Sequence, residues 1–87
     1  MITGKTESGF EFELNEEALD DYEMLEDLRS FDKGEYGVII DVVDKLLGEE
    51  QKDRLKDHIR NKEGKVSAQK MMEEITCIFE VSKELKN

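Results

Sequence analysis

The spacing of apolar residues changes at Asn15, and this change constrains the fold more than any other feature of the chain. Before it, apolar and acidic residues alternate from Phe10 to Leu14, which is the period of a half-buried strand. After it, apolar residues recur at three- and four-residue steps, as they do in amphipathic helices. The sequence therefore predicts an α+β, mostly helical fold, with a β-hairpin over residues 1–14 and a helical body of about four α-helices over residues 15–87.

The predicted hairpin pairs residues 2–5 with the alternating strand. Its reversal is expected at residues 6–9, where Gly9 supplies the positive φ that tight turns need. Because a lone hairpin is marginally stable, it must pack against the helices. We therefore expect one domain over residues 1–87, since a chain of 87 residues can build only one core.

The first helix is expected to begin after Asn15, a favourable N-cap, and to run to about Ser30. Acidic residues follow Asn15 and suit the positive end of the helix dipole. Four apolar residues at helical spacing predict its inner face: Ala18, Tyr22, Leu25 and Leu28. Residues 32–37 then form a turn with two glycines.

Three further helices are predicted. The apolar stripe over residues 38–47 ends at Gly48, a favourable C-cap, and residues 49–60 form a thinner amphipathic helix. After a turn at residues 61–64, Val66 and Ser67 are suited to open the last helix. Its inward stripe consists of Met71, Met72, Ile75, Ile78, Phe79, Ser82 and Leu85.

The charge of the chain excludes several classes of partner. The sequence holds 23 acidic and 13 basic side chains, a formal net charge of −10. This charge repels phosphate backbones and anionic lipid headgroups, so neither nucleic acid nor a membrane is an expected partner. Residues 1–50 carry 16 acidic and 4 basic side chains, whereas residues 51–87 carry 7 and 9. The acidic N-terminal half would favour a basic protein surface.

The apolar runs are too short and too often interrupted by charges to form a signal sequence or a membrane span. Cys77 is the only cysteine, so the chain cannot form an internal disulfide. We therefore expect the protein to reside in the cytoplasm.

No motif indicates catalysis, and we expect no catalytic, cofactor-binding or metal-binding residues. Residues 32–43 match an EF-hand loop at positions one, six and eight, yet Gly34, Tyr36 and Val43 occupy positions that require oxygen ligands. His58 is the only histidine, whereas a zinc site needs several converging ligands. A nucleophilic role for Cys77 would need a base beside it. The sequence therefore predicts a binding protein and not an enzyme.

The second predicted helix carries more apolar surface than one core face requires, because Ile40 points away from its apolar neighbours. Either the helix is buried all round, or part of it forms an exposed patch that contacts another protein. The adjacent methionines of the last helix present the same alternatives, because flexible side chains suit both cores and adaptable binding surfaces. The candidate partner-binding residues are Ile40, Leu47, Met71 and Met72.

The order of these motifs resembles small tail assembly chaperones of siphophages and of prophages in Gram-positive bacteria. The resemblance covers nearly the whole chain. Ser67 departs from it, because many such proteins have proline at this helix start. The matching segments are Gly9–Phe10, Asp20–Glu23, Leu46–Gln51 with Leu55, and Glu63–Val66.

The resemblance implies a protein that binds the tail tape measure protein and keeps it soluble while tail tube subunits polymerise around it. It also implies that a longer form can arise by a ribosomal frameshift. Two alternatives remain open. One is a small acidic inhibitor or nucleic-acid mimic that binds a basic protein surface, and the other is a homo-oligomeric structural subunit of the tail.

Overall fold

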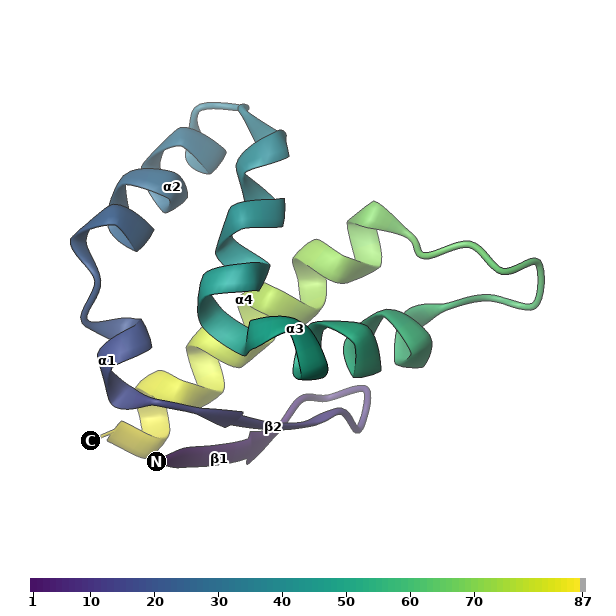
Figure 1. Ribbon diagram of the computed structural model, residues 1–87, viewed down its shortest axis with the longest axis horizontal. Helices are drawn as coiled ribbons and strands as arrows, with labels where there is room; N and C mark the ends of the chain where they lie inside the picture. Colours follow the sequence, from purple (N-terminus) through teal and green to yellow (C-terminus); the bar gives the residue numbers. More distant parts are fainter. Residues whose placement is uncertain (87) are drawn as a thin grey trace.

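The chain folds as an N-terminal hairpin followed by helices (Figure 1). A computed structural model describes residues 1–86, with side chains through Glu84. The α+β, mostly helical fold predicted from the sequence is confirmed. Its elements are β1 (Ile2–Lys5), β2 (Glu11–Leu14), α1 (Glu16–Leu19), α2 (Tyr22–Asp32), the short 3-10 helix η1 (Tyr36–Val38), α3 (Ile39–Ile59) and α4 (Ala68–Lys86).

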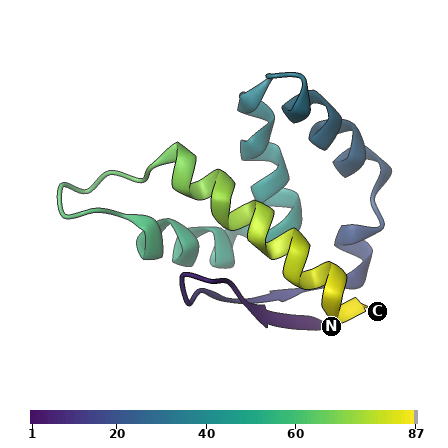
Figure 2. The same ribbon diagram turned by 180° about the vertical axis from the view of Figure 1, so that it is seen from behind.

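The predicted hairpin and its turn are confirmed. The strands β1 and β2 pair antiparallel, with Gly4 opposite Phe12. At the reversal, Gly9 has a φ of 94° and donates its N–H to the Thr6 carbonyl at 3.0 Å. The apolar face of the hairpin packs against α4 and α3, and the end of α4 lies beside the start of β1 (Figure 2). The buried residues of this face are Ile2, Phe10, Phe12 and Leu14.

The single helix predicted between Asn15 and Ser30 is wrong, because the chain forms two helices there. They are separated at Asp20 and Asp21. Asp21 has extended backbone, and its carboxylate accepts hydrogen bonds from the backbone N–H groups of the next helix at 2.9 and 3.3 Å. Aspartate favours helix N-caps over helix interiors, so the acidic pair ends α1 and starts α2.

This break changes which side of α2 faces the core. Met24 is buried, with only 1% of its surface exposed. Tyr22 and Leu25, which were predicted to point inward, are instead 74% and 59% exposed. A helix that restarts at a new cap has no fixed rotational phase relative to the helix before it. The inner face predicted by continuing one period through Asp20 is therefore wrong at these two positions.

Gly48 divides α3 into two helical segments, as the sequence predicted. Its φ of 76° and ψ of 169° lie in a region that only glycine adopts readily. Figure 1 shows α3 turning sharply in its middle. The first segment, residues 39–47, contains Lys45, which forms an ion pair with Asp27 of α2. Helices α2 and α3 also pack against each other. The second segment, residues 49–59, lies along β2, where Gln51 contacts the strand.

The start of α4 is also confirmed, because the Ser67 hydroxyl accepts a hydrogen bond from the Lys70 N–H at 3.2 Å. Val66 before it is half-buried against the core. Of the predicted inward stripe, Ile75, Ile78 and Ser82 are buried, and Met71, Met72 and Phe79 are half-buried. The side chain of Leu85 lies outside the described part of the structure.

One hydrophobic core connects the hairpin, α2, both segments of α3 and α4. None of the helices in residues 1–86 is long and apolar enough to cross a membrane. The buried apolar side chains are Ile2, Phe10, Phe12, Leu14, Met24, Val42, Val43, Leu46, Leu47, Leu55, Ile59, Ile75 and Ile78.

Candidate protein-binding surface

The four candidate partner-binding residues differ in how much of each side chain is exposed in the structure. Ile40 is 66% exposed, so it belongs to the surface and not to a helix buried all round. Leu47 is only 6% exposed and packs in the core, so it has almost no surface to offer a partner. Met71 and Met72 are half-buried at the start of α4. We therefore retain Ile40, Met71 and Met72 and remove Leu47 from the candidate surface.

Ile40 and Met71 line the same depression, which we call the Ile40 hollow. It forms where the bend at Gly48 directs the second segment of α3 away from the first, so that neither segment covers Ile40. Both segments and the start of α4 contribute to its walls. Its lining residues are Ile39, Ile40, Val43, Asp44, Lys52, Lys56, Val66 and Met71.

Met72 lines a second depression, the Met72 hollow, on another side of α4. Phe31 at the end of α2 and Tyr36 in η1 form its aromatic part, with ring centroids 5.2 Å apart in an edge-to-face arrangement. Tyr36 is 59% exposed, so the hollow presents an aromatic ring to solvent. The other lining residues are Glu7, Gln69, Glu73, Thr76, Cys77 and Glu80.

The sequence interpretation missed the contribution of Tyr36, which it assigned to a turn. Tyr22 and Leu25 were missed as surface residues for the different reason given above. Their exposed side chains lie one turn apart on α2, the spacing of two neighbours on a helix surface.

Ion pairs neutralise two lysines near the Ile40 hollow. Lys52 lies 3.1 Å from Asp44, and this hydrogen bond raises the pKa of Lys52. Lys45, outside the hollow, pairs with Asp27 at 2.9 Å, and its pKa is raised mainly by that hydrogen bond. Lys56 forms no ion pair with any residue in the described part of the chain. The rim of the hollow therefore carries a positive charge in a protein that is acidic overall.

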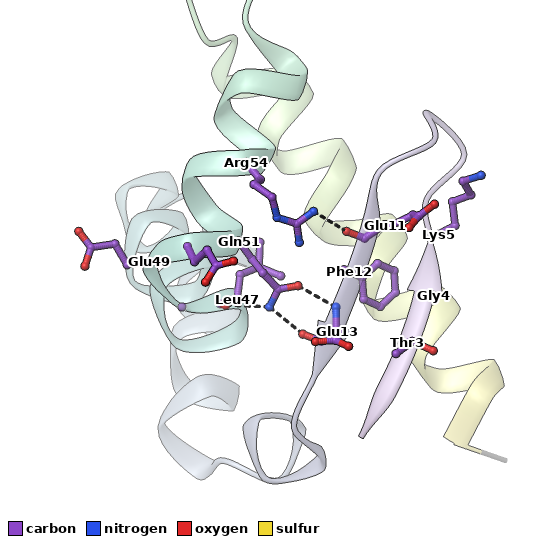
Figure 3. Close-up of a pocket in the computed structure, with 12 residues that line it drawn as sticks. Thr3, Gly4, Lys5, Glu11, Phe12, Glu13, Leu47, Glu49, Gln51 and Arg54 are labelled. Atoms are coloured by element: carbon purple, nitrogen blue, oxygen red, sulfur yellow. Dashed lines mark hydrogen bonds between the residues drawn. The ribbon is translucent and has the colours of Figure 1, made fainter.

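A third depression, the hairpin groove, separates the solvent face of the hairpin from the second segment of α3 (Figure 3). The Gln51 side chain reaches across it and forms two hydrogen bonds with the backbone of Glu13, accepting from N–H at 2.7 Å and donating to C=O at 2.8 Å. Arg54 donates to the Glu11 carbonyl at 3.5 Å. The charged residues that line the groove are Lys5, Glu11, Glu13, Glu49, Glu50 and Arg54.

The hairpin turn carries a polar cluster that brings a serine, a histidine and a carboxylate together. Thr6 and Ser8 each donate a hydroxyl proton to Glu74 at 2.8 Å, and Ser8 Oγ lies 3.0 Å from His58 Nε2. In a serine hydrolase the carboxylate orients the histidine, which then accepts the serine proton. Here the Ser8 hydroxyl donates its hydrogen bond to Glu74 and not to His58, so the three side chains lack the hydrogen-bond order of a serine hydrolase. The cluster instead attaches the turn to α3 and α4.

No protein family, curated protein or solved structure was found to match this chain. The family, the activity and the partners expected from the sequence resemblance therefore stay predictions. A functional assignment rests on the surfaces themselves, namely the Ile40 hollow, the Met72 hollow and the hairpin groove.

Proposed function

We propose that this chain is a phage tail assembly chaperone that binds an apolar segment of the tape measure protein and keeps it soluble. The observation that carries the proposal is the 66% exposure of Ile40 next to a hollow with apolar walls. A large aliphatic side chain placed in this way is suited to contact an apolar client. The net charge of −10 would keep the complex of chaperone and client dissolved.

The chemistry of the two hollows fits a helical client. An amphipathic helix binds a groove through apolar side chains three or four residues apart, and the Ile40 hollow can take such a side chain. Met71 and Met72 are flexible, so they can adapt to clients of varied sequence. Lys56 at the rim is suited to pair with a carboxylate or with the negative end of a client helix.

The experiment that tests the proposal is co-expression with the tape measure protein encoded beside its gene, followed by affinity pull-down at low and high salt. We expect soluble client to be recovered at both salt concentrations, because apolar contacts are weakly screened. The variants Ile40→Glu and Met72→Glu should fold, as judged by circular dichroism, and should recover less client.

Leu25→Glu is the matched control. Leu25 is exposed to a similar extent as Ile40 but lies on α2 and lines neither hollow. This variant should fold and retain the client. If the chain leaves the client insoluble, or if Leu25→Glu and Ile40→Glu reduce recovery equally, the proposed surface is wrong.

The hairpin groove favours a second candidate function, an acidic inhibitor or nucleic-acid mimic of a basic protein. Four glutamates line the groove against Lys5 and Arg54, and such a surface attracts cationic partners. Binding of this kind should weaken steeply as salt is added, because exposed charges are screened. Recovery of a partner that is lost at high salt and unaffected by Ile40→Glu would support the acidic inhibitor over the chaperone.

A further inference from the structure

The Met72 hollow is acidic as well as aromatic. Three glutamates line it, of which Glu7 belongs to the hairpin turn and Glu73 and Glu80 belong to α4. All three are exposed, and none forms an ion pair with a residue in the described part of the chain. No lysine, arginine or histidine among the described residues lines the hollow. Its carboxylates are therefore available to a cation from a partner.

The same hollow has apolar and aromatic walls. Phe31 and Met72 are half-buried, and Phe31 packs edge to face against Tyr36. This contact holds the Tyr36 ring in place, yet 59% of Tyr36 remains exposed. The face of an aromatic ring carries partial negative charge and attracts cations. A cationic side chain that enters the hollow would therefore be attracted by the ring as well as by the carboxylates.

We propose that the Met72 hollow binds an arginine side chain of the client protein, an inference that rests on the proposed chaperone function and names one of its contacts. A guanidinium is planar, so it can stack on the Tyr36 ring while its N–H groups donate to a carboxylate. It is also more weakly hydrated than the ammonium of lysine, which lowers the cost of placing it against apolar walls. The methylene stem of the arginine would lie on Met72.

Charge distinguishes the two hollows on either side of the start of α4. The Ile40 hollow is lined by two lysines and one aspartate, a formal charge of +1, whereas the three glutamates of the Met72 hollow give −3. An acidic client residue would be repelled from the Met72 hollow and attracted to Lys56, and an arginine would experience the reverse. Opposite charges at two contact sites favour one orientation of the client over the other.

The test is a titration of the full chain at low salt, followed by NMR of the methionine methyl groups. The probe is N-acetyl-arginine N-methylamide, and the matched probe is N-acetyl-citrulline N-methylamide, which has nearly the same shape without the charge. We expect the arginine probe to shift the Met72 methyl signal with half-saturation in the millimolar range. The citrulline probe should bind about fivefold more weakly, because it lacks the attraction of a cation to the ring and the carboxylates.

Two pairs of variants assign the binding to the hollow. Tyr36→Leu removes the aromatic ring but keeps an apolar side chain, and it should weaken binding of the arginine probe about fivefold. Tyr22→Leu is the matched control, because Tyr22 is 74% exposed and lines neither hollow. This control should bind the probe like the unmodified chain.

The second pair tests the carboxylates at constant net charge. Glu73→Gln combined with Glu80→Gln should weaken binding of the arginine probe, and this double variant preserves the test if Tyr36→Leu does not fold. Glu26→Gln combined with Glu63→Gln removes two exposed glutamates that line neither hollow, and it should leave binding unchanged. Equal binding of both probes, or equal weakening by the two double variants, would overturn the arginine site.

The titration does not involve the tape measure protein, so its outcome is separate from that of the co-expression experiment. Soluble client without binding of the arginine probe would overturn this inference and leave the chaperone function. Binding of the probe together with an insoluble client would refute the chaperone function and leave the arginine site. If both proposals hold, the Glu73→Gln and Glu80→Gln double variant should also recover less client than the Glu26→Gln and Glu63→Gln control.

Discussion

Gly4 offers a quantitative test of the packing between the hairpin and α4. A Cβ atom added to Gly4 would lie 2.7 Å from Phe12 Cζ and 3.0 Å from Val81 Cγ1. Both contacts are shorter than the optimal separation of about 3.5–4.0 Å between carbon atoms. The Phe12 ring is buried, with 2% of its surface exposed, so it has little space into which to move. We therefore expect Gly4→Ala to lower the free energy of unfolding by about 1–3 kcal/mol, the usual cost of overpacking a core.

Urea denaturation followed by circular dichroism measures this change as a lower midpoint at constant slope, and each kcal/mol should lower Tm by about 4–8 °C. Gly37→Ala is the control, because a Cβ there meets no atom within 4 Å and the backbone is not left-handed. This substitution should be neutral or stabilising by up to about 1 kcal/mol. A Gly4→Ala variant as stable as the unmodified chain would refute the close packing of α4 on β1.

Three further substitutions test the backbone, the core and the charges. Gly48→Ala should cost about 1–3 kcal/mol in urea denaturation, because alanine is strained in the conformation that bends α3; an unchanged midpoint would show that the bend does not require glycine. Ser82→Ala should stabilise the chain by about 1 kcal/mol in the same assay, because the Ser82 hydroxyl is buried without a hydrogen-bond partner in the described residues; a loss of stability would reveal such a partner. Because the folded-state pKa of Lys45 is raised above 10.5, its ion pair with Asp27 stabilises the fold below this pKa and is lost as the pH rises through the raised value. The difference in urea midpoint between the unmodified chain and Lys45→Gln should therefore disappear in strong alkali, and a difference that persists there would assign the effect to packing.

Local signals predicted much of the fold correctly. The alternation before Asn15 predicted β2, Gly48 predicted the division of α3, and Ser67 predicted the start of α4. Each of these features acts between residues that are close in sequence. The strand depends on alternating side chains, the division of α3 on the backbone freedom of glycine, and the start of α4 on a capping hydroxyl. The error at Asp20 and Asp21 had a local cause as well, because a second capping residue interrupted the helix and reset its phase.

The candidate surface could be predicted only in part. Excess apolar residues on one helix indicated that Ile40 was a candidate contact residue, yet the same pattern also selected Leu47, which is buried. The two residues differ because the tertiary contacts cover one and leave the other exposed, and helical period alone does not determine what packs against each side. Tyr36 belongs to the Met72 hollow because its ring packs against Phe31, which lies five residues earlier on the other side of a turn.

The sequence by itself determined the element types, the positions where they begin and bend, and the acidic character of the chain, because these depend on neighbouring residues and on composition. Only the tertiary structure decided which face of α2 is buried, that Gln51 occupies the edge of β2, and that α4 packs against β1. Gln51 and Glu13 are 38 residues apart. Their contact depends on the direction in which the bend at Gly48 sends α3, and a short segment of sequence does not contain that information.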